Sequence, residues 1–194
     1  MKTLYIECNM GAAGDMLMCA LYELLEDKQG FLDTMYGLGL PGVRGGASPA
    51  VTSGIAGTHI KITVHGEEED EHLHHHEHDH GHHHDHDHPH DHEHHHHHDH
   101  PHDHEHHHHH HATPGHIAGL IDHLPLPEEV RTHAKGVYDA IAQAEAKAHG
   151  CPVGEVHYHE VGALDAVADV AGVCYTLYLL KPEKIVVSPI HVGS

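Results

Sequence analysis

Apolar residues recur at every second position near the start of the chain and at helical spacing after it. Leu4, Ile6 and Cys8 predict a short strand, because strict alternation places them on one face. A helix is expected next, with one apolar face and an end at Gly30. The apolar positions of that face are Leu17, Ala20, Leu21, Leu24 and Leu25.

Two short strand-like runs follow a glycine-rich connection over residues 37–46. Residues 50–53 and 58–65 flank the sequence GIAG, and this pattern predicts a β-hairpin. The second run alternates apolar and polar residues, so its apolar side chains should face the core. These side chains are Ile60, Ile62 and Val64.

Two helices are predicted after residue 111. Thr113 followed by Pro114 is typical of a helix start, and Pro125 should end this short helix. A longer helix should begin near Pro127 and run to Gly150, a residue type that commonly follows a helix end. The apolar side of the longer helix is expected to carry Val130, Ala134, Val137, Ile141 and Ala148.

The last part of the chain completes a mixed fold. A third helix is predicted over residues 163–179, and residues 184–192, rich in Ile and Val, predict a buried strand. The fold class is therefore α/β or α+β, one small mixed domain with its strand order open. The last strand lacks a following element to cover it. Either it lies at a sheet edge, or the chain is the front portion of a larger protein, truncated at this strand.

Residues 67–111 differ in composition from everything around them. Of these 45 residues, 27 are histidine and 14 are Asp or Glu, and Leu73 is the one apolar residue larger than Gly or Pro. Such a segment buries too little apolar surface to offset the entropy of ordering it, so we expect disorder. The folded domain should then consist of residues 1–66 joined to residues 112–194.

Net charge and cysteine content limit the expected classes of binding partner and the expected cellular compartment. The net charge is −21, and outside residues 67–111 there remain 16 acidic residues against 9 basic ones. Without clustered Lys and Arg, a nucleic acid is not an expected partner. Four scattered cysteines with no CxxC pair, and a start that reads as a strand, predict a cytoplasmic protein with free thiols. No apolar run is long enough to span a membrane, so a membrane is not an expected partner.

The sequence ECNMGAAGDM, residues 7–16, is the first candidate site. A strand, a tight turn and a helix start follow one another here, so backbone N–H groups and the positive end of the helix dipole converge. Gly11, Gly14 and Asp15 are the candidate binding residues for a phosphate or carboxylate. The alternative is that the glycines only form the turn and that Asp15 caps the helix. The spacing fits neither a Walker loop nor a dinucleotide-binding fingerprint.

The histidine tract is the second candidate site. Neutral imidazoles one or two positions apart can gather around divalent nickel, copper, zinc or cobalt, with no selectivity encoded. An internal run interleaved with Asp and Glu favours a metal store or antenna over an inert spacer or a purification tag. The candidate ligands lie in its densest runs and include His94, His95, His96, His106, His107 and His108.

The sequence HYHEVGALDAVAD, residues 157–169, is the third candidate site. Asp165 and Asp169 are four apart, so on a helix they share one face in apolar surroundings, where carboxylates need a partner or a cation. His157, His159 and Glu160 precede that helix. The set suits metal binding or general acid–base chemistry. For any single residue, a helix cap or a solvent-facing position is the alternative.

Several of these motifs together resemble one known family. GAAGDM after an N-terminal strand, the hairpin SGIAGTHIKITV, the internal His-rich insertion, VHYHEVGALDAVADVAG and SPIHVGS are similar to the nickel insertion proteins of nickel-pincer cofactor biosynthesis. The resemblance covers nearly the whole chain outside the low-complexity tract. It implies insertion of nickel into pyridinium-3,5-bisthiocarboxylic acid mononucleotide, with one carbon–nickel and two sulfur–nickel bonds, for lactate racemase-type enzymes.

The resemblance also implies roles for residues and partners. His159, Glu160 and Asp165 are the catalytic candidates, with His159 or Glu160 as the base that removes the ring proton. His157, His159 and Asp169 are the candidate nickel ligands, beside the tract. CTP, with Mg or Mn, is implied as a co-substrate whose site lies on a C-terminal half that this chain lacks. A homo-oligomer is left open. The competing function is a non-enzymatic store or metallochaperone for nickel or zinc.

Overall fold

The computed structural model describes residues 1–9, 11–52, 54–64, 112–158 and 160–192. Helices and two small sheets alternate along the chain, which confirms the predicted mixed α/β class. The helices are α1 (Gly14–Tyr22), α2 (Lys28–Tyr36), α3 (Pro114–Asp122), α4 (Glu128–His149) and α5 (Leu164–Leu180), with short 3-10 turns at Val153–Glu155 and Glu160–Gly162. The strands are β1 (Thr3–Ile6), β2 (Val43–Thr52), β3 (Ile55–Val64) and β4 (Lys184–Val187).

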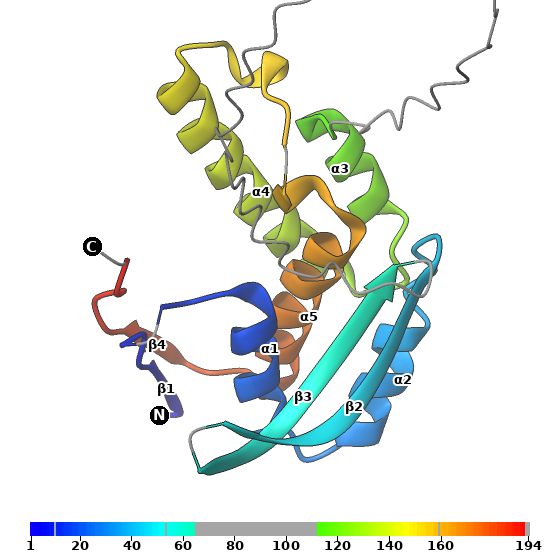
Figure 1. Cartoon of the computed structure of the whole chain (residues 1–194), viewed down its shortest axis with the longest axis vertical. Coiled ribbons are helices and arrows are strands. Elements are labelled where there is room, and N and C mark those ends of the chain that lie inside the picture. The colour runs from blue at the N-terminus through cyan, green and yellow to red at the C-terminus, as the bar shows by residue number, and fades with distance from the viewer. Residues whose placement is uncertain (10, 53, 65–111, 159, 193–194) are drawn as a thin grey trace, which may run out of the picture. The chain divides into compact units, whose positions relative to one another are not determined.

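Helix α5 lies at the centre of the packed region, in contact with all four other helices and with β3 (Figure 1). Small buried residues let its neighbours approach closely. A methyl group added to Gly172 would meet the side chain of Met18 from α1 and would lie 3.0 Å from Cε of Met35 from α2. Glycine at this position therefore allows three helices to converge on one point of the core.

The predicted first helix is in fact two helices. Helix α1 ends at Tyr22, and α2 begins where the Asp27 carboxylate accepts a hydrogen bond from the Gly30 amide at 2.8 Å. Gly30 therefore lies in the first turn of a helix, and its prediction as a helix end is wrong. Because α1 stops early, Ala20 and Leu24 are exposed. The side chains that this segment buries are Met18, Leu21, Tyr22 and Leu25.

The predicted hairpin is confirmed, with longer strands than expected. Strands β2 and β3 pair antiparallel over ten residues each, so β2 already begins inside the predicted connection. The turn includes Gly54, which has a φ of +81°, and the rest of GIAG belongs to β3. Ile60 is buried and Ile62 is half-buried, as expected for core-facing positions. The side chain of Val64 lies outside the described part.

The boundaries of the two helices after residue 111 are largely as predicted. The Thr113 hydroxyl caps α3 by accepting from the His116 amide at 3.3 Å, although α3 ends at Asp122, before Pro125. Helix α4 ends at Gly150, whose φ is +67°. Its buried face is shifted, however, and Val137 and Ala148 are exposed. The residues buried by α4 recur every four positions and are Val130, Ala134, Tyr138, Ala142 and Ala146.

The prediction of a long buried strand near the end of the chain is wrong. Strand β4 covers only Lys184–Val187 and pairs in parallel with β1. Among the described residues these two strands form a sheet of their own, so Ile185 and Val187 stay exposed. A run of Ile and Val predicts a strand that can be buried, but burial also needs elements that cover both faces.

Candidate functional site

The glycine turn after β1 is tied to the segment after β4. The Cys8 carbonyl accepts hydrogen bonds from the amides of both Gly11 and His191, each at 3.1 Å. The Cys8 amide in turn donates to the Ser188 hydroxyl at 2.8 Å. Gly11 has a φ of +90°, which favours glycine. The turn is therefore held in one conformation, with His191 beside it.

Gly14 brings α1 directly against α5. A side chain at Gly14, the first residue of α1, would place its Cβ 3.0 Å from Cβ and 3.6 Å from Oδ2 of Asp169. This is tighter than ordinary contact between carbon atoms, so a side chain at this position would have to push Asp169 or α1 aside slightly, and glycine favours this packing. The N-terminal end of α1 therefore lies against the Asp169 carboxyl group.

Helices α1 and α5 begin in the same way. The N-cap residues, Ala13 and Ala163, have extended backbones and form no side-chain capping bond. Asp15 and Asp165 occupy the first turns, where a carboxylate interacts favourably with the helix dipole. The alternative reading of these two aspartates as N-caps is wrong, because alanine holds the cap position in both helices. Neither helix start is closed by its own cap side chain, which leaves capping to water or to a ligand.

Three carboxyl groups gather where these helix starts meet. The pKa of Asp169 is raised to about 7. Burial is the largest cause, and the nearby charges of Asp15 and Asp165 add to it. One oxygen of Asp165, Oδ1, is buried and has no hydrogen-bond partner within the described part of the chain. A buried carboxylate without a partner is costly, so this cluster favours binding of a proton or a cation.

Two tyrosines fix the chain segment that leads into α5. The Tyr138 hydroxyl donates to the Val161 carbonyl at 3.0 Å, and the Tyr158 hydroxyl donates to the Tyr138 carbonyl at 2.9 Å. Burial raises the pKa of Tyr138 well above its usual value, and Tyr158, Asp165 and Asp169 add to the effect. Tyr138 therefore stays a neutral hydrogen-bond donor next to the carboxyl cluster.

The turn before α5 is also sterically constrained. A Cβ at Gly162 would lie 2.9 Å from Cβ of both Ala112 and Tyr158. The Tyr158 amide donates to the Ala112 carbonyl at 2.9 Å, so this segment is tied to the residues that precede α3. These contacts fix the position of the turn that leads into α5 and that includes the backbone of Glu160.

The predicted site residues fall into three groups. Gly14, Asp15, Asp165 and Asp169 lie together at the starts of α1 and α5, and Gly11 is in the turn that leads to α1. The side chain of His157 is exposed, next to buried Tyr158. The third group lies outside the described residues and comprises His159, the side chain of Glu160 and the tract histidines His94, His95, His96, His106, His107 and His108.

A complete metal site is not formed by the described residues. Within them, no group of three or more His, Cys, Asp and Glu side chains is arranged to hold a metal ion. The roles of His157 and Asp169 as ligands, and of Asp165 as a catalytic residue, therefore stay predictions. The carboxyl cluster has the chemistry for a cation but needs further ligands, such as a bound substrate or residues of the undescribed segments.

Sequence reasoning missed three residues that the fold brings to this region. Tyr138 was missed because the helical pattern placed its neighbour Val137 on the apolar face of this helix instead. Ser188 and His191 belong to the sequence SPIHVGS, which marks the family resemblance but gives no spacing signal of its own. Their contacts with Cys8 arise only because β4 pairs with β1.

Two of the four thiols, Cys19 and Cys174, have raised pKa values, which makes them poor metal ligands at neutral pH. All four cysteines are free, and Cys8 and Cys174 are buried. Burial raises the pKa of Cys174 to about 11. Burial also raises the pKa of Cys19, whose Sγ accepts a hydrogen bond from the Ile60 amide at 3.3 Å. Cysteine binds a metal as the thiolate, which a raised pKa disfavours, so nitrogen and oxygen donors suit this site better than Cys19 or Cys174.

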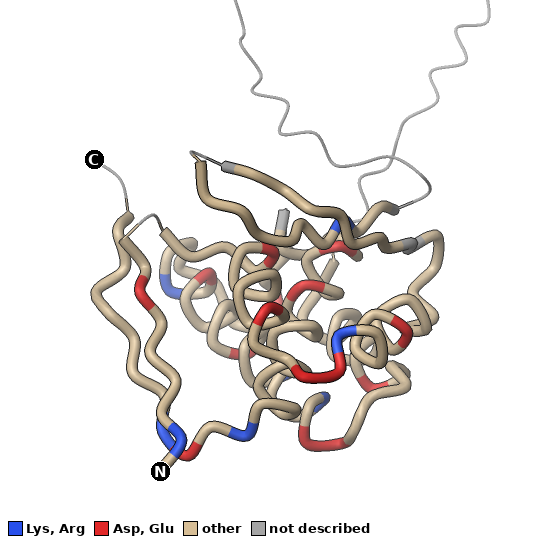
Figure 2. Tube along the Cα trace, turned by 90° about the horizontal axis from the view of Figure 1, so that it is seen from below, with Lys and Arg blue, Asp and Glu red and all other residues tan. Residues whose placement is uncertain are grey.

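The charge distribution agrees with a site for a cation rather than for a polyanion. Figure 2 shows the Lys and Arg positions of the described chain scattered over several elements, without a continuous basic stripe of the kind that binds nucleic acid. Among the described helices, none is both long enough and apolar enough to cross a membrane.

The described residues therefore define a small mixed α/β protein with a carboxyl cluster at the joint starts of α1 and α5. Residues 4–194 match the nickel insertion protein family, and the chain belongs to this family. It is 36% identical over 194 residues to a protein of Lactiplantibacillus plantarum and 32% identical over 194 residues to one of Acetivibrio thermocellus. Both relatives are called pyridinium-3,5-bisthiocarboxylic acid mononucleotide nickel insertion protein.

The chain is much shorter than these relatives. The matches include 100% of this chain but 41% of the Lactiplantibacillus protein and 40% of the Acetivibrio protein. A protein of Clostridium kluyveri with the same name, 31% identical over 199 residues, is covered to 42%. No solved structure matches the chain. The chain spans about two fifths of the length of the relatives it matches.

Proposed function

We propose that this chain forms the nickel- and mononucleotide-handling part of an enzyme that inserts nickel into pyridinium-3,5-bisthiocarboxylic acid mononucleotide. Two relatives above 30% identity carry the name of this substrate. The structural observation that supports the proposal is the contact between Gly14 and Asp169, which sets a carboxyl cluster against the glycine turn. A cation and a phosphorylated ring can then meet at the joint starts of α1 and α5.

The chemistry exchanges a proton for a metal ion. Nickel(II) replaces the hydrogen on the ring carbon between the two thiocarboxylate groups, whose sulfur atoms supply two further bonds. The proton passes to His159 or Glu160, and no electron is gained or lost. His157, His159 and Asp169 hold nickel before the transfer. Nitrogen and oxygen ligands exchange more readily than a closed thiolate site, which suits an ion that is passed on.

Asp165 and Asp169 control the charge of the site. With a pKa of about 7, Asp169 exists in both protonation states near neutral pH. Arrival of Ni²⁺ favours the ionised form, and departure of nickel with the product favours proton uptake. Asp165, with its unpaired buried oxygen, acts beside it as an electrostatic partner of the entering cation.

The phosphate of the mononucleotide binds at Gly11, Gly14 and Asp15. The first turn of α1 offers backbone N–H groups at a helix start that its own cap side chain does not close, and Gly11, whose amide is bonded to the Cys8 carbonyl, shapes the turn that leads to it. Asp15 repels a bare phosphate, so binding is favoured when nickel or another cation accompanies the nucleotide.

CTP and its Mg or Mn ion belong to the part of the protein that this chain does not cover. A groove beside β1 and α1 is lined by apolar residues and Glu7, with no Lys or Arg among its lining residues. Such a surface does not suit a triphosphate, which needs positive charge or dedicated backbone loops. We therefore assign no residue of this chain to CTP.

Residues 67–111 serve this function as a nickel reservoir in a cytoplasmic protein. Its 27 histidines can hold several ions and raise the local nickel concentration beside the folded domain. Affinity should fall as the pH drops through the histidine range, because protons compete for the same nitrogen atoms.

The test combines this chain with the part of the Lactiplantibacillus relative that it does not match, CTP, Mg²⁺, Ni²⁺ and the bisthiocarboxylate mononucleotide. Product is measured by mass spectrometry and by activation of a racemase. We expect Glu160→Gln, His159→Ala and Asp169→Asn to lower the insertion rate by about tenfold or more, in the range of lost acid–base or ligand groups. Asp33→Asn, which removes an exposed carboxylate on α2, should leave it unchanged. Full activity in all three site variants contradicts the proposal.

A nickel or zinc store without enzymatic activity is the second candidate, because the tract alone provides abundant metal ligands. Deletion of residues 67–111 separates the two functions. An insertion enzyme keeps its activity at saturating nickel after the deletion. A store loses nearly all of its bound metal, measured by equilibrium dialysis with Ni²⁺ and Zn²⁺.

A further inference from the structure

The β1–β4 sheet exposes apolar side chains on both of its faces. Residues in register on parallel strands point the same way, so Leu4 and Ile185 share a face with Ile6 and Val187, while Tyr5 points to the other face. Ile185 is 45% exposed, Val187 50% and Tyr5 59%. Parallel strands are normally covered on both faces, and a sheet of two strands is barely stable alone. This sheet therefore has the surface of an interior element.

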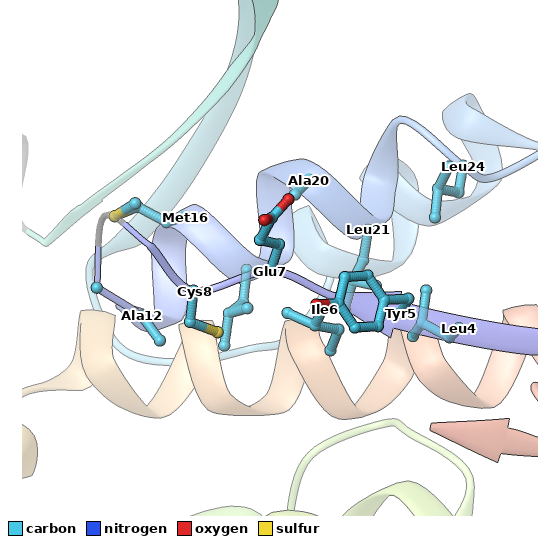
Figure 3. Close-up of a pocket in the computed structure, with 12 residues that line it drawn as sticks. Leu4, Tyr5, Ile6, Glu7, Cys8, Ala12, Met16, Ala20, Leu21 and Leu24 are labelled. Carbon is cyan, nitrogen blue, oxygen red and sulfur yellow. The ribbon is translucent and has the colours of Figure 1, made fainter. Parts of the chain in front are cut away.

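A groove follows the edge of β1 that faces away from β4. Five successive residues, from Leu4 to Cys8, line it together with Met16 and Ala20 of α1 and Leu24 just after that helix, and it has a cavity volume of about 210 Å³ (Figure 3). Successive strand residues point to opposite faces, so a groove that all five line runs along the strand edge. The space beside β1 has an apolar wall provided by α1.

The backbone of β1 is oriented toward this groove as well. The Lys2 carbonyl accepts from the amides of Glu183 and Lys184, and the Ile6 carbonyl accepts from the Ser188 amide. These even-numbered residues therefore turn their backbone groups toward β4. By the alternation of a parallel ladder, the odd-numbered residues Tyr5 and Glu7 direct theirs to the opposite edge, where the groove lies.

We infer that this edge of β1 is a docking surface for a strand from the part of a full-length nickel insertion protein that this chain does not cover. About three fifths of each relative's length has no counterpart here, which is ample for such an element. The strand adds to β1 through backbone hydrogen bonds and packs apolar side chains against Ala20 and Leu24. Glu7, the one charged residue in the groove, selects a Lys or Arg near that end of the strand.

The hairpin tip offers a matched comparison. Val51 is 71% exposed and Ile55 is 76% exposed, so both present as much apolar surface as the residues around β1. They lie at the paired ends of β2 and β3, next to the turn, and are not among the residues that line the groove. Exposed apolar side chains alone do not define the docking surface. The combination of groove, strand edge and uncovered sheet does.

The experiment measures binding of this chain to the separately produced part of the Lactiplantibacillus relative that the chain does not match, by calorimetry without nickel or nucleotide. The matched part of the same relative serves as the positive control. We expect Tyr5→Lys with Leu24→Lys to weaken binding by about tenfold or more, a loss of about 1.4 kcal/mol or more. Val51→Lys with Ile55→Lys adds the same charge and should change binding less than about twofold. On binding, the amides of Tyr5 and Glu7 should exchange hydrogen more slowly.

Each other outcome overturns the inference. Equal binding by both double variants, stronger loss in the hairpin variant, or no binding of the wild-type chain removes the docking surface. Self-association of this chain that the groove variant abolishes assigns the surface to a second copy instead. The inference shares with the proposed function the need for a second protein part. Binding is measured without substrates, so a failure of catalysis leaves this result intact.

Discussion

The α1–α5 interface and the β1–β4 sheet lie at the two ends of the same short connection, yet they differ in how far they are packed. Met18 and Val167 are fully buried at the interface, and Gly14 allows the backbones to approach closely. In the sheet, Tyr5, Ile185 and Val187 remain about half exposed. The apolar side chains of the interface are covered by the described residues, whereas the sheet presents apolar surface for which those residues provide no cover.

The two regions therefore suit different functions. The interface brings Asp169 close to two other carboxyl groups, and burial there raises the pKa of Asp169 to about 7. The sheet offers backbone groups and apolar side chains to another polypeptide. The packed interface therefore bears on the proposed chemistry, and the sheet bears on the proposed docking of another protein part.

The largest effect should come from breaking the packed side of the comparison. Met18→Ala should lower the free energy of unfolding by about 2–5 kcal/mol, because it leaves a cavity between α1, α2 and α5. Val187→Ala, at a position 50% exposed, should lower it by about 0.5 kcal/mol or less. Urea unfolding followed by circular dichroism measures both values. An equal cost for the two variants would mean that the sheet is as well packed as the helices.

The next effect concerns the buried charge at the interface. The folded-state pKa of Asp169, about 7, lies above the usual 3.8, so the folded protein binds a proton that the unfolded chain releases. Stability should therefore fall as the pH rises from about 4 to about 7, by a few kcal/mol at about 1.4 kcal/mol per pKa unit. Asp169→Asn should remove this pH dependence and raise stability at pH 8.

Asp33→Asn serves as the control, because Asp33 is an exposed carboxylate whose removal leaves the interface intact. Unfolding curves at several pH values, taken with residues 67–111 deleted, remove the contribution of the histidine tract. If both variants keep the wild-type pH dependence, Asp169 is not the group responsible.

The smallest effect comes from alanine substitutions at two glycines, which should change the stability of the protein in opposite directions. Gly14→Ala should destabilise the protein by about 1–3 kcal/mol, because the added Cβ lies 3.0 Å from Cβ of Asp169. Gly119→Ala in α3 meets no atom within 4 Å and should stabilise the protein by about 0.5–1 kcal/mol through reduced backbone entropy. Thermal melting distinguishes the signs. Stabilisation by Gly14→Ala would show that the two helices can separate without cost.

Local signals in the sequence predicted most elements correctly. Thr113 before Pro114 and Gly150 after α4 mark real helix boundaries, and the alternating residues before and after Gly54 form the hairpin. The errors occur where local signals compete. Gly30 suggested a helix end, but Asp27 binds its amide and starts a new helix, because capping decides helix boundaries more strongly than glycine alone.

Part of the candidate site could also be predicted from the sequence. Asp165 and Asp169 had to share a helix face because they are four residues apart. Their proximity to Gly14 and Asp15, more than 140 positions away in the sequence, carried no local signal. The same holds for Tyr138, whose hydroxyl reaches the Val161 carbonyl only in the packed structure.

The sequence by itself determined which segments form helices and strands, where apolar faces lie in outline, and which residue types can bind nickel and phosphate. These properties depend on neighbours within a few positions. Only the tertiary structure decided that Gly14 touches Asp169, that Asp15 and Asp165 lie near the half-buried Asp169, and that β1 and β4 are left partly exposed by the described residues. Such facts depend on contacts between distant segments, and the free energy of those contacts comes from packing that no local pattern encodes.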